Sequence, residues 1–264
     1  MPGRAGRKVV NRTIFLFSEL LRRDLSTRYA GTFGGTLWAL LHPIILCALY
    51  SFVFVVVIRL SPPPGFPASY AEFLLAGLLP WLGFQEALAR STTSVSDQGH
   101  LVKKLQFPVE LLVASSAAAA LVLQLVGLAV LGGFVLATGR GHVQPPVLVA
   151  ALAFEIVLLA GPCLLLAALN VFFRDLSQLV SPLLMVVLYL TPILYPASLI
   201  PGPLAPLLAM NPVSDLVTLF RAALFGGPLP PPLRLAAWTG AFLLLSVAAR
   251  GFFRRSRYVF SDLL

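Results

Sequence analysis

The run VELLVASSAAAALVLQLVGLAVLGGFVLA, residues 109–137, decides the fold, because its 29 residues include a single charge, Glu110. At about 1.5 Å per residue, a helix of this length crosses the roughly 30 Å hydrocarbon core of a bilayer. Other long apolar stretches predict further spans at Gly34–Ile58, Tyr70–Ala89, Val147–Val171, Leu179–Tyr195 and Leu235–Phe253. The sequence therefore predicts an all-α integral membrane protein with six transmembrane helices.

The composition of the whole chain agrees with that prediction. Of its 264 residues, 58% are hydrophobic and 11% are charged, whereas a soluble globular domain has roughly 25% charged residues. A soluble fold of this size could not hide so much apolar surface. The net charge is +9, but most cations lie between apolar runs and form no wettable basic face of the kind that nucleic-acid-binding proteins present. Partners are therefore membrane lipids, with no nucleic acid.

The distribution of cations predicts the orientation. If the N-terminus is cytoplasmic, fifteen of the nineteen Lys and Arg residues fall on the cytoplasmic side. The other side keeps Arg59, Arg140, Arg221 and Arg234. This positive-inside bias predicts a multi-pass protein of the bacterial cytoplasmic (inner) membrane with both termini in the cytoplasm.

The first segment, residues 1–33, is expected to be cytoplasmic and to contain an amphipathic helix on the membrane surface, from Ile14 to Tyr29. Asp24 and Arg28 fall on its apolar arc, four residues apart, where they could pair. Because lipid disfavours charge, we expect this end of the helix to face protein. Residues 34–264 form the six-span domain.

Two connecting regions are longer than simple turns. Residues 90–108 form a cytoplasmic loop that can hold a short helix. On the outer side, residues 197–234 include a helix bracketed by Asn211-Pro212 and Gly226-Gly227, an N-cap, a first-turn proline and a terminating glycine. This helix is only about 20 Å long, so we expect it to re-enter the membrane or to lie in the outer leaflet.

The chain has no visible site for catalysis or for a cofactor. None of its three lysines follows a glycine, so a P-loop cannot be written, and ATP with Mg²⁺ would be used by another chain. Cys47 and Cys163 lie inside apolar runs, and the three histidines are isolated, so we expect no metal site.

Two polar features inside or beside the spans have two interpretations each. In the turn from Asn170 to Asp175, Asp175 could cap the next helix with Gln178 as its capping-box partner. Alternatively, Arg174 and Asp175 could contact a cytoplasmic motor, and both roles are compatible. Glu155 lies inside the fourth span, where it is either a functional carboxylate or a hydrogen-bonded packing residue.

Aromatic residues within the spans also have two interpretations. Most could be interfacial or packing residues. Alternatively, they could line a channel for sugars, because Tyr and Trp rings offer an apolar face and a polar edge. The candidate lining residues are Trp38, Tyr50, Phe54, Tyr189 and Tyr195.

Several stretches, in order, resemble one family. They are Arg23-Asp24-Leu25-Ser26-Thr27-Arg28-Tyr29 with Gly35, Leu37-Trp38 and Pro43; Lys103-Lys104 with Phe107-Pro108; Asn170 to Asp175; Thr191-Pro192-Ile193-Leu194-Tyr195; and Asn211-Pro212 with Phe220-Arg221. In this order and topology the chain resembles a type-2 ABC exporter permease of the polysaccharide-export branch. The O-antigen permeases are nearest in pattern, with teichoic-acid and capsule permeases close behind.

The resemblance implies a homodimer joined to two copies of a separate ATP-binding subunit, exporting a lipid-linked polysaccharide such as an O-antigen-like or capsular glycan. It implies an entrance helix with Arg23, Asp24, Arg28 and Tyr29, and short outer helices that close the external mouth. It also implies a coupling segment docked on the ATPase, to which we assign Gly99, Leu101, Lys103, Lys104, Phe107, Arg174 and Asp175. The proline-rich outer loops depart from the expectation of a large external sugar-recognition surface.

Two other functions stay open. A drug or lipid exporter permease of the same fold would have a smaller, apolar cavity and no amphipathic entrance helix. A membrane-embedded glycosyltransferase would need clustered carboxylates at a membrane face, whereas the ten acidic residues here are scattered singly.

Overall fold

The computed structural model describes residues 4–27, 37–104, 108–204, 206 and 210–263, and the regular structure in these ranges is helical. The long helices are α1 (Arg4–Thr27), α2 (Leu37–Ser51), α3 (Tyr70–Thr93), α5 (Glu110–Thr138), α6 (Pro145–Phe172), α7 (Leu176–Leu190), α9 (Pro212–Phe225) and α10 (Pro232–Leu263). The short ones are the π-helix η1 (Phe52–Val57), which continues α2, α4 (Gly99–Lys104), η2 (Ala197–Leu199) and η3 (Gly202–Leu204).

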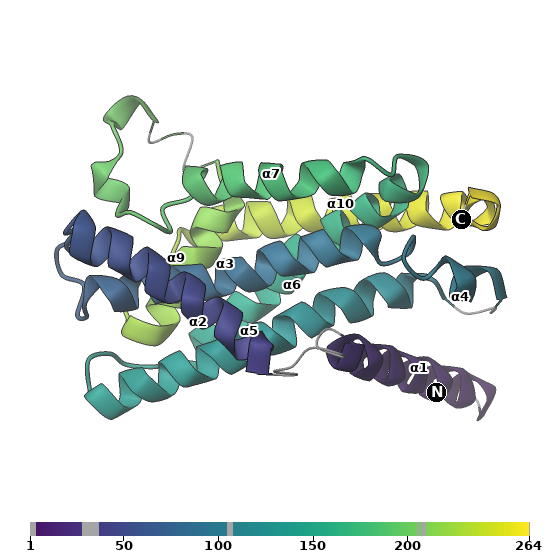
Figure 1. Ribbon diagram of the computed structural model, residues 1–264, viewed down its shortest axis with the longest axis horizontal. Helices are drawn as coiled ribbons and strands as arrows, with labels where there is room; N and C mark the ends of the chain where they lie inside the picture. Colours follow the sequence, from purple (N-terminus) through teal and green to yellow (C-terminus); the bar gives the residue numbers. More distant parts are fainter. Residues whose placement is uncertain (1–3, 28–36, 105–107, 205, 207–209, 264) are drawn as a thin grey trace.

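Helices α2, α3, α5, α6, α7 and α10 run along the long axis of the molecule and form a bundle (Figure 1). Helices α1 and α4 lie at the end of the bundle where the described chain begins and ends. Helix α9 and the η2–η3 region lie toward the other end, with α9 packed against α3 and α6. Cytoplasmic and outer sides are named below by the predicted orientation, so the α4 end is the inner end and the α9 end is the outer end.

Within the residues that the structure describes, three helices are long and apolar enough to cross a membrane: Glu110–Thr138, Pro145–Phe172 and Pro232–Phe260. The apolar helices Ile44–Val57 and Leu176–Leu190 are shorter. Helix α3 has 24 residues and is packed by α5, α6, α7 and α9, so most of its surface faces protein and tolerates polar residues. An integral membrane protein is consistent with these helices, and six crossings stay a prediction.

Several helix ends differ from the sequence-based expectations. Helix α1 begins at Arg4, ten residues before the expected start at Ile14. The fifth predicted span ends at Leu190, not at Tyr195. The last helix continues well beyond Phe253 because Phe253 and Phe260 are fully buried in an aromatic cluster with Phe172, which extends the helix at the inner end.

Capping residues close in sequence explain the helix ends that agree with the sequence-based expectations. At the start of α3, Ser69 and Glu72 form a capping box, which satisfies two backbone donors. At the start of α9, the Asn211 side chain accepts a hydrogen bond from the backbone N–H of Val213, and Pro212 occupies the first turn. Gly226, with a φ of 76°, ends that helix in a conformation that suits glycine.

Candidate functional site: an inner junction and an outer clasp

A buried asparagine joins two cytoplasmic connections at the inner end. Asn170, near the end of α6, donates through Nδ2 to the Ser96 hydroxyl at 3.1 Å, in the loop before α4. Its Oδ1 accepts from the backbone N–H of Ser177 at 3.2 Å, in the first turn of α7. We call Ser96, Asn170 and Ser177 the inner junction, because they tie the loop that precedes α4 to the start of α7.

The inner junction corrects the capping box predicted at Asp175 and Gln178. Asp175 occupies the position before α7, but its backbone is helical and its side chain makes no capping hydrogen bond. Gln178 bonds through its backbone N–H to the Asp175 carbonyl. The cap is instead supplied from α6 by Asn170, so the carboxylate of Asp175 and the side chain of Arg174 are left exposed at the surface.

The residues predicted to contact an ATPase are placed at this same end where the structure describes them. Leu101 of α4 packs against the hydrophobic core, and α4 contacts α10. The side chains of Lys103 and Lys104 lie outside what is described, although their backbone completes α4, and Phe107 lies outside the described residues altogether. Gly99 begins α4, and Arg174 and Asp175 lie in the turn before α7, which the inner junction ties to the loop before α4.

The predicted entrance helix packs against α5. Asp24 bonds to Arg90 of α3 at 3.4 Å, and Arg90 also lies 3.7 Å from Glu86. This end of α1 therefore faces protein, as its charges indicated. Ile14, expected on the apolar arc, is 61% exposed, and Arg23 is exposed as well. Arg28 and Tyr29 lie outside the described residues.

A partly buried arginine organises the outer end. Arg221, on α9, donates hydrogen bonds to the carbonyl oxygens of Phe73 (3.2 Å), Pro192 (2.8 Å) and Ile193 (3.0 Å). Its guanidinium also lies 3.5 Å from the centre of the Phe73 ring. Arg221, which the sequence analysis counted as an outer cation, thus points into the protein. Its planar guanidinium carries several N–H donors and can bond several carbonyls at once. Gly77 leaves room for it, because a Cβ there would lie 2.8 Å from Nη2.

Two more side chains hold the same turn. The Tyr70 hydroxyl of α3 donates to the Leu194 carbonyl, and Asn211 donates through Nδ2 to the Thr191 hydroxyl at 2.8 Å. We call Tyr70, Asn211 and Arg221, with the turn 191–195 that they hold, the outer clasp. The clasp brings together two stretches that are separate in the sequence, Thr191 to Tyr195 and Asn211 to Arg221.

A further ion pair joins α9 to α10 beside the clasp. Asp215, which is buried, accepts from Arg234 at 2.5 Å. This pair and the clasp attach α9 to three neighbouring segments, and most of its residues are buried. Helix α9 is therefore a packed part of the outer end.

Glu155 lies at the centre of the bundle and is fully buried. Its Oε2 accepts a hydrogen bond of 2.7 Å from Gln124 Nε2 on α5. Gly83 of α3 makes room for this pair, because a Cβ at Gly83 would lie 1.7 Å from Gln124 Oε1. The arrangement fits the interpretation of Glu155 as a hydrogen-bonded packing residue that joins α3, α5 and α6.

Four of the five candidate channel-lining aromatics lie on α2–η1 and at the end of α7. Tyr50 and Phe54 stack with ring centres 6.4 Å apart, and the Tyr195 hydroxyl donates to the Tyr189 carbonyl. Tyr189 is 52% exposed, and its hydroxyl lies near that of Tyr50. We call Tyr50, Phe54, Tyr189 and Tyr195 the aromatic patch. The side chain of Trp38 lies outside what is described.

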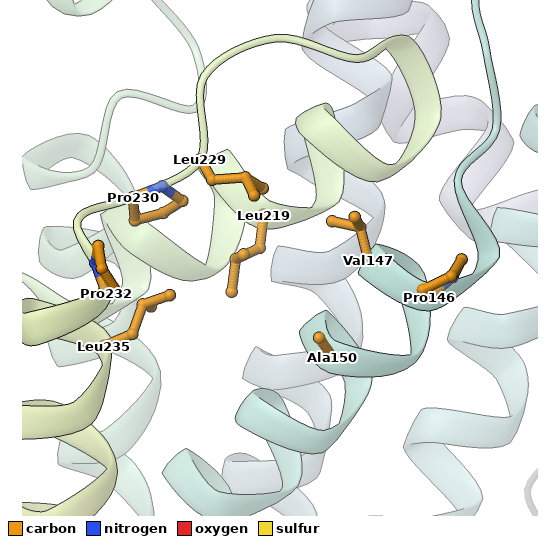
Figure 2. Close-up of a pocket in the computed structure, with 8 residues that line it drawn as sticks. All are labelled: Pro146, Val147, Ala150, Leu219, Leu229, Pro230, Pro232 and Leu235. Atoms are coloured by element: carbon orange, nitrogen blue, oxygen red, sulfur yellow. The ribbon is translucent and has the colours of Figure 1, made fainter.

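A separate open groove of about 400 Å³ lies at the outer end between α6, α9 and α10. Figure 2 shows its walls, which are formed by Pro146, Val147, Ala150, Leu219, Leu229, Pro230, Pro232 and Leu235. These side chains carry no polar group that could hold a sugar hydroxyl or a phosphate. The groove therefore suits hydrocarbon, and we assign no glycan to it.

The sequence analysis did not identify the partners that make these sites. Ser96, Tyr70 and Gln124 were not predicted as site residues, and Arg221 entered only as an outer cation and as part of the Phe220-Arg221 stretch. The sequence feature that could have identified these residues is a polar or charged side chain within an otherwise apolar helix. Such a side chain must face another part of the protein and not lipid. The partners themselves depend on which helices pack together, and that information is not local.

The chain was compared with known proteins. Residues 16–225 match the family described as "ABC-2 type transporter". The O-antigen export system permease protein RfbA of Myxococcus xanthus is 35% identical over 257 residues, 94% of each chain. Two Klebsiella pneumoniae proteins of the same name are 28% and 26% identical, covering 95% of this chain and 96% of each relative. Because the family match covers most of the sequence, this chain belongs to the ABC-2 type transporter family.

Proposed function

We propose that this chain is the transmembrane subunit of an ATP-driven exporter that moves a lipid-linked polysaccharide, of O-antigen type, out of the cytoplasm. The observation that carries the proposal is the similarity to a permease named for O-antigen export, at 35% identity over 94% of both chains. A match over nearly the full length takes in the predicted spans together with the connections between them.

The proposed assembly is a homodimer with two copies of a separate ATP-binding subunit, which would bind ATP and Mg²⁺. The proposed docking surface is the inner end, where α4 contacts α10 and the inner junction ties the loop before α4 to the turn before α7, which carries Arg174 and Asp175. Packing of Leu101 against the core supports a rigid attachment of α4 to the bundle, which a coupling segment needs in order to transmit force.

The proposed path for the glycan lies between two copies of the chain, along the aromatic patch. In a single chain Tyr189 is half-exposed at the outer end of α7. Exposed tyrosines suit the apolar faces and hydroxyl edges of sugar rings better than they suit acyl chains. A two-fold axis beside this patch would bring two such surfaces face to face and form a channel lined by rings.

The proposed topology has six crossings with both termini in the cytoplasm, in the inner membrane of a bacterium. Its support is the positive-inside bias and the shared position of α1, α4 and the C-terminal end of α10 at one end of the bundle (Figure 1). The proposed role of α1, as an amphipathic helix beside the cytoplasmic opening, is supported by its packing on α5 and by the Asp24–Arg90 pair.

A drug or lipid exporter of the same fold is the second candidate, and the apolar groove between α6, α9 and α10 favours it, since that groove suits hydrocarbon alone. Deleting the gene in the source organism separates the two candidates. We expect the mutant to keep its glycan inside the cell, detectable after lysis and absent from the intact surface. Normal surface glycan together with altered sensitivity to apolar toxic compounds would favour the second candidate.

A further inference from the structure

Helix α7 packs on α3 along one narrow face and is held by polar contacts at its two ends. Its 15 residues span about 22 Å, and only Val180, Leu184 and Leu188 are buried along it. At its inner end the first turn is held by Asn170. At its outer end the turn that follows is held by the outer clasp. Helix α7 therefore has the form of a strut between the inner junction and the outer clasp.

The inner attachment of α7 is made by the side chain of Asn170, which forms one hydrogen bond with its amide nitrogen and another with its amide oxygen. Asn170 is 3% exposed, so neither of its hydrogen bonds can be replaced at once by bulk water. Its amide nitrogen bonds the Ser96 hydroxyl, and its amide oxygen bonds the Ser177 backbone. Ser96 precedes α4 by only three residues. A displacement of the loop before α4 is thus transmitted through Asn170 to the start of α7.

The outer end of α7 is attached to the outer clasp, so a displacement of α7 would move the turn that the clasp holds. Thr191 ends α7 and is bonded by Asn211, and the next two carbonyls are bonded by Arg221. Both side chains come from α9 or from its N-cap. Pro182 removes one backbone hydrogen bond within α7, but the helix continues to Leu190 and its buried residues on both sides of Pro182 pack in the core, so its two ends do not move independently.

We infer that Asn170 is a positioning residue that couples the loop before α4, through α7, to the outer turn 191–195. This inference rests on the proposed function, because it assigns Asn170 to the route by which ATP hydrolysis at the inner end would act on the outer end. Asn170 touches neither nucleotide nor glycan on this route. Its action is to keep Ser96 and Ser177 at a fixed separation.

The test uses the full complex with its ATP-binding subunit and three variants of this chain. Asn170→Leu removes both bonds and keeps the branched shape of the side chain, whereas Ser96→Ala removes the bond from Asn170 together with the local bond from the Ser96 hydroxyl to the Thr93 carbonyl. Ser94→Ala is the matched control, because the Ser94 hydroxyl makes the same kind of local bond, to the Ser91 carbonyl three positions earlier, but is not the acceptor of the Asn170 amide. The readouts are surface glycan per ATP hydrolysed and amide hydrogen exchange over residues 170–180.

We expect Asn170→Leu and Ser96→Ala to lower the glycan exported per ATP by at least about fivefold, the lower range of a coupling free energy between sites. Exchange at the start of α7 should rise in both variants, and Ser94→Ala should change neither readout. Combining Asn170→Leu with Ser96→Ala should cost no more than Asn170→Leu alone, because the two residues form one link.

Normal export per ATP in Ser96→Ala, or losses that multiply in the double variant, would overturn the inference. If Asn170→Leu does not assemble, Ser96→Ala decides alone. If the unaltered complex neither hydrolyses ATP nor exports glycan, the proposed function fails. Hydrogen exchange still judges the link in that case, since unchanged exchange at the start of α7 in Ser96→Ala would refute it independently of transport.

Discussion

Replacing Arg221 with methionine should destabilise the protein far more than a typical substitution. Methionine keeps most of the side-chain length but has no donor. The change removes the hydrogen bonds to the carbonyls of Phe73, Pro192 and Ile193 and the contact with the Phe73 ring. The turn after α7 would then lose the side chain that holds it against α3.

The magnitude follows from these contacts. Hydrogen bonds from a charged donor contribute about 1.5–3 kcal/mol each, and a desolvated cation over a ring contributes about 2 kcal/mol. The cost of burying the guanidinium offsets much of this sum. Removing one partner of a buried charged network typically costs about 3–5 kcal/mol, and we expect a loss of that size for Arg221→Met.

The assay is the thermal unfolding of the purified chain in detergent, with all variants heated at one rate because membrane proteins often unfold irreversibly. A loss of about 4 kcal/mol corresponds to a fall in the apparent Tm of roughly 10 °C for a chain of this size. The apparent Tm of Arg221→Lys should fall less than that of Arg221→Met because lysine keeps a charged donor, but it should still fall because a compact ammonium cannot match the planar fork. Arg250→Met, at an exposed position of α10, is the control and should stay within about 0.5 kcal/mol.

The result that refutes this reasoning is also clear. If Arg221→Met unfolds within about 2 °C of the unaltered chain, the clasp does not hold the outer turn. If Arg221→Lys is as stable as the unaltered chain while Arg221→Met is not, the fork geometry contributes nothing and only the charge of the side chain matters.

Three further predictions concern other parts of the molecule. Gly83→Ala should destabilise the protein by about 1–3 kcal/mol, because its Cβ would displace Gln124. The apparent Tm should therefore fall, and an unchanged Tm would contradict the packing. Charge reversal at Lys103-Lys104 should reduce recovery of the ATP-binding subunit in pull-downs, while full recovery would remove α4 from the docking surface. In a chain without native cysteines, a cysteine placed at His142 should react with a thiol reagent added outside the cell. A cysteine placed at Tyr258 should react only after permeabilisation. External labelling at position 258 would overturn the topology.

The parts of the fold that sequence predicted well depend on near neighbours. The helix Pro212–Phe225 was expected with these bounds because an asparagine N-cap, a proline and a glycine each act within a few residues. Apolar length likewise predicted the spans centred on α5 and α6. These signals require no knowledge of what packs where.

The candidate sites could not be predicted in the same way, because their contacts join distant residues. Asn170 bonds Ser96, 74 positions away, and Arg221 bonds Phe73, 148 positions away. The capping box at Asp175 was wrong for this reason, since Asn170 reaches the first turn of α7 from the preceding helix. Local chemistry offered a plausible cap, and tertiary packing supplied a different one.

The central claim is ATP-driven export of a lipid-linked glycan by this chain with a separate ATP-binding subunit. The most direct test is transport by the purified complex in sealed proteoliposomes that carry radiolabelled lipid-linked glycan in one leaflet. The account predicts that ATP moves the label to the leaflet opposite the ATP-binding subunits, and that a hydrolysis-deficient partner abolishes the movement. ATP hydrolysis without any movement of the label, or movement that continues without the partner, would contradict it.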